Sequence, residues 1–185
     1  MTDFNLAAFQ QQISSQKAAL PPVDKWNPEF CGDIDIQIKH DGTWFYMGTP
    51  IGRKALVKLF ASVVKRENDD YFLVTPVEKI GIQVEDSPFI ITQWHKEDNK
   101  LVLTTNTEHD LIVSSENPIQ LFTDKKTAAY LPYALVRRNL WARLHQNVFY
   151  QLADLAVELG GEQDLDGKPH LMLNSGDYRF SLGEL

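Results

Sequence analysis

The chain has 185 residues, a hydrophobic fraction of 43% and 10 Phe, 4 Trp and 6 Tyr, a composition that excludes a disordered chain and can fill one large or two small packed domains. Cys31 is its single cysteine, which excludes an intramolecular disulfide and a thiolate-rich metal site. The net charge of −7 disfavours non-specific binding to nucleic-acid phosphates. Because no signal-peptide pattern and no membrane-length apolar stretch is present, we expect a cytoplasmic protein without a membrane span.

The first predicted elements are a short helix and an extended segment. Residues 3–19 form an amphipathic pattern with Asp3 as the expected N-cap, and Pro21 and Pro22 end it. The Pro-interrupted residues that follow are expected to be extended. We therefore assign residues 1–21 to an N-terminal helix and linker.

A first α+β domain is predicted over residues 22–86. Ile34, Ile36 and Ile38 alternate with polar residues, and His40-Asp41-Gly42 turns this strand into an aromatic one at 44–46. Thr49 and Pro50 resemble the N-cap and first position of a helix over 51–65. Strands over 71–74 and 80–84 then close the domain.

A second domain is predicted over residues 87–185. Short strands over 88–144 form a β-meander, and a helix runs from about Asn147 to Leu159, where Gly160-Gly161 is a typical C-terminal signal. A hairpin around Ser175-Gly176-Asp177 ends the chain. The predicted fold class is α+β, with two tandem related units of antiparallel sheet, each packed by one helix.

The relation between the units is predicted from a repeated hairpin and helix. The segment IQIKHDGTWFYMGTP matches ALVRRNLWARLHQNV at an offset of about 98 positions, with few identities but the same order of elements. Duplication is favoured, and chance is the alternative because a hairpin followed by a helix is common.

Arg53 is the first candidate site residue. On a helical wheel it falls with Val57 and Phe60, so its stem is expected to lie against the core while its guanidinium needs a partner. One interpretation is a structural ion pair with Asp33, Asp35 or Glu78. The other is an anion-binding arginine in a cleft between the two domains.

Basic residues form the second candidate site. The predicted outer face of the first helix carries Lys54, Lys58, Lys65 and Arg66, whereas the second helix exposes Asp154 and Glu158. A second basic group lies on the later hairpin and consists of Arg137, Arg138 and Arg143. Most charged helix faces are simply solvated, and the alternative is a nucleic-acid site.

Other functional patterns are weak. Asp33 and Asp35 share a strand face and are a possible but unspecific cation site, and Trp44 and Tyr46 share a face that is more typical of a core or an interface. The five histidines show no metal spacing, and we find no phosphate loop, no nucleophile elbow and no metalloprotease signature. We predict no metal and no cofactor, and an enzyme is the weaker default.

The strings GTWFY, PIGRKALV, LVTPVEK and LPYALVRRNLWARL resemble the bacterial proteins of the domain of unknown function 1285 family, with the resemblance running from about Trp26 to Ala156. The resemblance implies a duplicated α+β core, a second domain similar to pleckstrin-homology folds, and a ligand or partner site between the domains. By matching motif, it places Trp44, Tyr46, Arg53, Glu78 and Arg138 at that interface. No activity is implied.

The leading functional hypothesis is a non-enzymatic binding or signalling module that takes a protein or another ligand in the groove between its domains. The alternative is a nucleic-acid-binding protein that uses the basic residues of the first helix and of residues 137–143. The third is an unrecognised enzyme that uses Asp33, Asp35 or Glu78 as acid, base or metal ligand.

Overall fold

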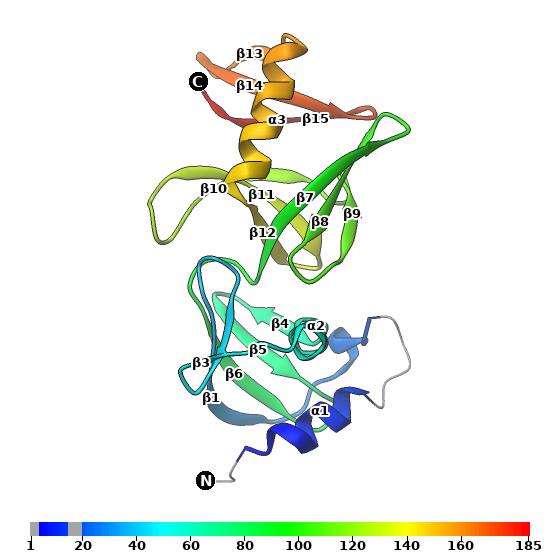
Figure 1. The fold of residues 1–185 in the computed structure, drawn as a ribbon, viewed down its shortest axis with the longest axis vertical. Helices are drawn as coiled ribbons and strands as arrows, with labels where there is room; N and C mark the ends of the chain where they lie inside the picture. Colours follow the sequence, from blue (N-terminus) through cyan, green and yellow to red (C-terminus); the bar gives the residue numbers. More distant parts are fainter. Residues whose placement is uncertain (1–3, 15–19) are drawn as a thin grey trace. The chain divides into compact units, whose positions relative to one another are not determined.

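The structure is a computed structural model that describes residues 4–14 and 20–185. The chain divides into two compact units, Met1–Pro88 and Phe89–Leu185, and each unit is a mostly antiparallel sheet with helical packing (Figure 1). The predicted α+β class with two tandem units is therefore confirmed. None of the helices in the described part of the chain is both long and apolar enough to cross a bilayer.

The N-terminal helix α1 (Leu6–Ser14) belongs to the first unit. Asn5 begins it, because its Oδ1 accepts the Ala8 N–H at 3.0 Å. Phe9 and Ile13 are buried, and the ring centroid of Phe9 lies 6.0 Å from that of Phe60. The predicted N-cap Asp3 lies outside the described residues. A single 3-10 turn, η1 (Val23–Lys25), follows.

The sheet of the first unit contains two antiparallel sets of three strands. Its strands are β1 (Phe30–Ile38), β2 (Trp44–Tyr46), β3 (Thr49–Pro50), β4 (Val64–Glu67), β5 (Asp70–Val74) and β6 (Lys79–Val84). They lie in the order β3-β2-β1-β6-β5-β4. The central pair, β1 and β6, is parallel, with Gln37 opposite Gln83. The first and last strands of the unit therefore meet in the middle of its sheet.

Helix α2 (Lys54–Ala61) is shorter than the predicted helix over 51–65, and that prediction is wrong at both ends. Thr49 and Pro50 do not begin a helix but pair with β2. At the other end, Ser62 terminates the helix, and the β-branched Val63 and Val64 favour the extended chain that becomes β4. Only the middle of the predicted helix is helical.

The sheet of the second unit has the same plan. Its strands are β7 (Phe89–Glu97), β8 (Lys100–Thr105), β9 (Asp110–Ile112), β10 (Ile119–Thr123), β11 (Tyr130–Arg137) and β12 (Leu140–Leu144). Their order is β10-β11-β12-β7-β8-β9. The central pair, β12 and β7, is again parallel, with Arg143 opposite Ile90. The predicted single meander is therefore two three-stranded meanders, β7 to β9 and β10 to β12, which are joined where β7 pairs with β12.

Helix α3 (Gln146–Glu158) follows the sheet, as predicted, and packs on β7 and on a second, three-stranded sheet. That sheet contains β13 (Glu162–Leu165), β14 (Lys168–Ser175) and β15 (Tyr178–Glu184), and β14 and β15 form the predicted C-terminal hairpin. Strand β15 also packs on β10 and β11. The core of this unit thus lies between two sheets and one helix.

The topology corrects the repeat that the sequence predicts. Both six-stranded sheets have their strands in the order third, second, first, sixth, fifth, fourth, if the first sheet is followed from β3 to β4 and the second from β9 to β10. The equivalent strands are therefore β1 to β6 and β7 to β12. The offset of about 98 positions instead aligns β1 and β2 with β11 and β12, which hold different places in their sheets.

Candidate functional site

The predicted site residues of the first unit lie in different environments. Trp44 is only 1% exposed, with its ring centroid 6.4 Å from that of Phe60, and so belongs to the core. Tyr46 is half-buried on β2, and Glu78 is half-buried in the turn between β5 and β6. Trp44 therefore presents no surface to a ligand.

Arg53 does not lie on an apolar helix stripe. It is the N-cap of α2, its backbone is extended at φ −84° and ψ 103°, and its side chain is exposed. Among the described residues, no hydrogen bond or ion pair involves the Arg53 side chain, so the predicted ion pair with Asp33, Asp35 or Glu78 is not formed. The predicted position of Arg53 on the helical wheel is wrong because the helix begins at Lys54, one residue after Arg53. A ligand contact by Arg53 stays a prediction.

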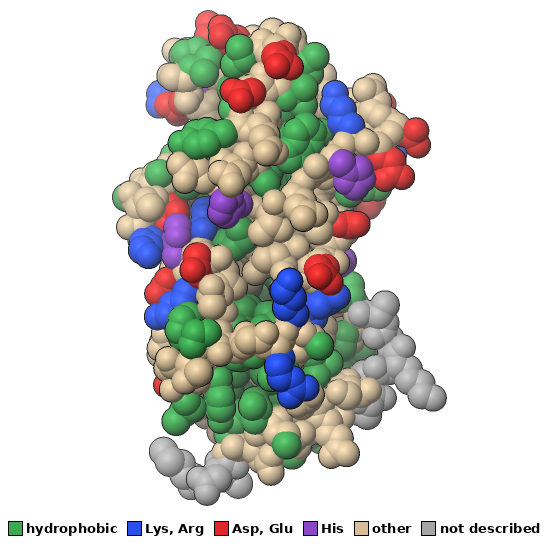
Figure 2. Space-filling view, viewed as in Figure 1, with side chains coloured by type: hydrophobic (Ala, Val, Ile, Leu, Met, Phe, Trp, Pro, Cys, Tyr) green, Lys and Arg blue, Asp and Glu red, His purple; other side chains and the backbone are tan. Residues whose placement is uncertain are grey.

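The predicted basic face of α2 is smaller than expected. Lys54 and Lys58 are exposed on the helix, and in Figure 2 Lys and Arg side chains lie over the region of α2. Lys65 and Arg66 instead belong to β4, where Lys65 lies 3.6 Å from Glu67 and Arg66 lies 3.5 Å from Asp69. These two cations are neutralised locally, which weakens the predicted nucleic-acid surface.

The predicted basic group of the second unit, Arg137, Arg138 and Arg143, is mostly not at its surface. Arg143 is buried on β12, and its Nε lies 3.8 Å from Oδ2 of the buried Asp124. Arg137 is half-buried with its guanidinium 5.0 Å from the ring centroid of Phe89. Burial, and then the charge of Arg138, lowers the pKa of Arg137 to about 10. The predicted basic group is thus largely part of the packing of its unit.

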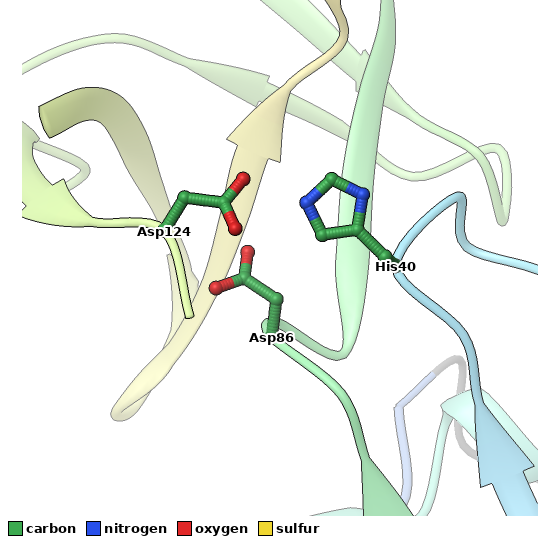
Figure 3. A group of neighbouring side chains, drawn as sticks. All are labelled: His40, Asp86 and Asp124. Atoms are coloured by element: carbon green, nitrogen blue, oxygen red, sulfur yellow. The ribbon is translucent and has the colours of Figure 1, made fainter. Parts of the chain in front are cut away.

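Figure 3 shows the side chains of His40 and Asp86 of the first unit and of Asp124 of the second unit. His40, in the β1–β2 turn, and Asp86, after β6, belong to the first unit and bring ligand atoms within 4.8 Å of each other. Two such groups are fewer than the three or four protein ligands of a zinc site. Asp124 belongs to the second unit, where its Oδ1 accepts the N–H groups of Lys126 and Thr127.

A cavity of about 280 Å³ opens at the surface of the second unit. Three segments form it, namely the β7–β8 turn, the C-terminal end of α3 and the β14–β15 hairpin. The lining residues are Lys96, Asn99, Leu159, Gly160, Gly161, Met172, Leu173, Asn174, Gly176 and Arg179. Its size is near the lower end of the range for small-molecule pockets.

Backbone hydrogen bonds hold these three segments together. The Gly176 N–H donates to the Asn99 carbonyl at 2.8 Å, and the Met172 N–H donates to the Gly161 carbonyl at 2.6 Å. The Leu101 N–H donates to Oγ of the buried Ser175 at 2.8 Å. At Gly161, a Cβ atom would lie 2.1 Å from the Met172 carbonyl oxygen, so only glycine permits this approach. The cavity is therefore bordered by fixed backbone.

The charged side chains that line the cavity are both cations. Arg179 donates from Nε to Gln163 Oε1 at 3.0 Å and from Nη1 to Asn174 Oδ1 at 3.2 Å, which fixes its guanidinium. Within the described residues, neither Arg179 nor Lys96 has an acidic partner. Neither cation therefore has a carboxylate in ion-pair contact among the described residues.

Sequence patterns did not reveal this cavity. The turn at 97–99, the Gly160-Gly161 helix end and the turn at 175–177 were each predicted, but their meeting is a tertiary event. Lys96 and Arg179 are 83 positions apart (179 − 96) on exposed strand positions without a motif. A doubled glycine at the end of a helix was the one local signal of close packing there.

Fold and cavity together define a two-unit α+β protein with a small cation-lined cavity in its second unit. Family models match both units, one described as "Domain of unknown function (DUF1285), N-terminal domain" over residues 21–87 and one as "Protein of unknown function (DUF1285), C-terminal domain" over residues 88–182. The chain therefore belongs to the DUF1285 family, as its sequence resemblance predicts.

Two solved structures are similar to this chain. A DUF1285 family protein from Silicibacter pomeroyi DSS-3 is 38% identical with a TM-score of 0.81, covering 100% of this chain and 97% of that one. A DUF1285 family protein from Shewanella baltica OS155 is 28% identical with a TM-score of 0.52, covering 64% of this chain and 90% of that one. Comparison with curated proteins gives no match.

Proposed function

We propose that the protein is a ligand-binding module that takes a small anion in the cavity of its second unit. The observation that carries the proposal is the lining itself, in which Lys96 and Arg179 have no acidic partner among the described residues. An anion supplies the missing countercharge, and an arginine held by two hydrogen bonds loses little freedom on binding it. The proposed ligand site is therefore this cavity and not the surroundings of Arg53.

Two further features support an anion over a cation. The C-terminal carbonyls of α3 would otherwise attract positive charge, but Val157 and Ala156 carbonyls already accept the N–H groups of Gly160 and Gly161. Among the described residues, no carboxylate side chain lines the cavity. The side-chain amides of Asn99 and Asn174 add neutral polar groups that can donate to bound oxygen atoms.

The broader predictions are compatible with this proposal. A binding or signalling role in a groove between the halves stays a prediction, and so does a cytoplasmic location, which the single exposed Cys31 supports. The proposed anion site differs in position from the predicted groove between the halves, because every residue that lines it belongs to the second unit.

The test is a titration of the ¹⁵N-labelled full chain with acetate, hexanoate and phosphate at constant ionic strength, followed by NMR. We expect saturable shifts of the Asn99, Gly161 and Gly176 amides for at least one anion. Lys96→Gln and Arg179→Gln should each weaken binding roughly three- to tenfold, as expected for the loss of a charged hydrogen bond at an exposed site.

The matched control is Lys54→Gln, which removes one exposed positive charge in the first unit. It should leave the affinity unchanged. Arg179→Lys separates charge from geometry, since it keeps the charge but loses the planar fork and should bind with intermediate affinity. If no anion shifts these amides, or if Lys54→Gln weakens binding as much as Lys96→Gln, the proposed site is wrong.

A further inference from the structure

Resting on the anion site proposed above, we infer that its ligand is a monocarboxylic acid with a short apolar chain, the carboxylate lying between Lys96 and Arg179 and the chain lying on Leu159 and Met172. Phosphate and sulfate are the main competing anions. Three observations favour the carboxylic acid: where the glycine N–H groups point, which donors of Arg179 remain, and what else lines the cavity.

The glycine N–H groups of the lining are already used. Gly160 donates to Val157 at 3.0 Å, Gly161 to Ala156 at 2.8 Å and Gly176 to Asn99 at 2.8 Å. Phosphate sites typically surround the anion with free backbone N–H groups from a glycine-rich loop or a helix N-terminus. This cavity has glycines but lacks that arrangement, since the helix end that it contains is a C-terminus. Its donors to a ligand are side chains.

The donors that remain on Arg179 suit a planar anion. A guanidinium has five N–H groups, and two of them are bonded to Gln163 and Asn174, so three remain, on Nη1 and Nη2. Two adjacent guanidinium N–H groups match the two oxygens of a carboxylate. The Lys96 ammonium is a point charge that can approach either oxygen. One carboxylate would therefore use both cations.

The apolar residues of the lining indicate that the ligand carries an alkyl chain. Leu159 is 62% exposed at the end of α3 although it lines the cavity, and Met172 is buried beside it on β14. An inorganic anion would leave this apolar surface in contact with water. An alkyl chain would cover it, and each buried methylene strengthens binding through the hydrophobic effect. The volume of about 280 Å³ limits the ligand to a short chain.

The experiment compares acetate, butanoate, hexanoate and phosphate by isothermal titration calorimetry of the full chain at constant ionic strength. We expect affinity to rise about two- to fourfold per methylene from acetate to hexanoate. Phosphate should bind more weakly than hexanoate, and hexanol, which has the chain without the charge, should not compete.

A matched pair of helix variants locates the chain. Leu159→Ser should flatten the dependence on chain length, so that it weakens hexanoate binding far more than acetate binding. Val157→Ser removes a similarly exposed apolar residue, 60% exposed, that does not line the cavity, and it should change neither. The amide spectrum of each variant shows whether it is folded.

The outcomes separate this inference from the proposed function. Phosphate binding as tightly as hexanoate, or equal affinities along the carboxylate series, would overturn the monocarboxylic acid and leave an anion site in place. An effect of Val157→Ser as large as that of Leu159→Ser would place the chain elsewhere and also overturn it. Failure of every anion to bind would remove the proposed function and this inference together.

Discussion

The two units build the same six-stranded sheet but place their helices at different points of the chain. In the first unit α2 is inserted between the third and fourth strands, whereas in the second α3 follows the sixth strand and leads into an additional three-stranded sheet. The sheet order is therefore the shared feature, and the helices are the variable one. The candidate ligand cavity lies where the second unit departs from the first.

The difference also explains why the repeated hairpin and helix is misleading. In the second unit the helix directly follows an aromatic strand, the sixth of its sheet. In the first unit the aromatic strand is the second of its sheet, and the short β3 separates it from the helix. The order of local elements can repeat without equivalent positions in space. Strand order in the sheet is the more reliable criterion.

The largest predicted effect comes from removing the side chain that packs a helix against the core of its own unit. Phe60 of α2 and Leu152 of α3 are both fully buried, so Phe60→Ala should cost about 3–5 kcal/mol and Leu152→Ala about 2–5 kcal/mol of unfolding free energy. Urea denaturation measures the cost, and amide exchange should show lost protection first in the unit that carries the substitution. The exposed control Lys54→Ala should change little. A cost below about 1 kcal/mol at Phe60 would show that α2 is not a core element.

The second comparison concerns one closely packed glycine in each unit. A Cβ at Gly161 would meet the Met172 backbone oxygen at 2.1 Å, whereas one at Gly81 would meet Oδ1 of the Asp33 side chain. Because backbone cannot rotate away, Gly161→Ala should cost about 1–3 kcal/mol and also disturb the cavity. Gly81→Ala should cost about 0.5–1.5 kcal/mol, the cost of a shifted rotamer.

Thermal denaturation of both variants measures this difference. Gly52→Ala is the control, since nothing lies within 4 Å of its added Cβ. If Gly161→Ala were as well tolerated as Gly52→Ala, the Met172 backbone would not pack closely on Gly161 at the border of the cavity.

A third comparison contrasts two turns with a positive φ. The β4–β5 turn uses Asn68 at φ 55°, and the β11–β12 turn uses Arg138 at φ 52°. Asparagine tolerates this conformation better than arginine, so Arg138→Asn should stabilise the second unit by about 0.5–1 kcal/mol. Part of that gain comes from removing the positive charge beside Arg137. Arg138→Lys, which keeps charge and strain, is the control in the same urea experiment, and equal effects of the two variants would refute the explanation.

Acidification should lower the free energy of unfolding of the two units in different pH ranges. In the second unit, burial and then the charge of Arg137 lower the pKa of His109, while Asp110 opposes them. The unfolded chain then binds the proton more readily, so the free energy of unfolding falls as the pH drops through about 6.5. His109→Gln and His109→Asn should both reduce this slope between about pH 7 and 5. An unchanged slope in both variants would exclude His109 as its source.

The first unit should respond at lower pH and more weakly. The hydrogen bond from Lys79 Nζ, at 2.5 Å, is the main cause of the lowered pKa of Glu67. Its contribution is present above the ordinary glutamate value of about 4.5 and is lost as the pH falls through the lowered one. Since the Glu67 side chain is 37% exposed, Glu67→Gln should cost less than about 1 kcal/mol at neutral pH. Parent and variant should converge as the pH falls below the lowered pKa of Glu67, and a constant difference would contradict this assignment.

The sequence predicted those parts of the fold that depend on local patterns. The alternation at Ile34, Ile36 and Ile38 indicated β1, and Gly160-Gly161 marked the end of α3. The ends of α2 were missed because apolar spacing continues through Val63 and Val64, where strand pairing overrides the helical period. The cavity was missed because Lys96 and Arg179 meet only through the packing of two hairpins on one helix end.

The parallel pair at the centre of each sheet has a consequence for synthesis on the ribosome. Strand β1 stays without its central neighbour until β6, the last strand of the first unit, has emerged, and β7 waits in the same way for β12. Until then, each growing unit consists of two small sheets with open edges, a state that favours pairing with other chains. We therefore expect each six-stranded sheet to close late, in one step, when its sixth strand leaves the exit tunnel and fills the gap between the two sheets already made.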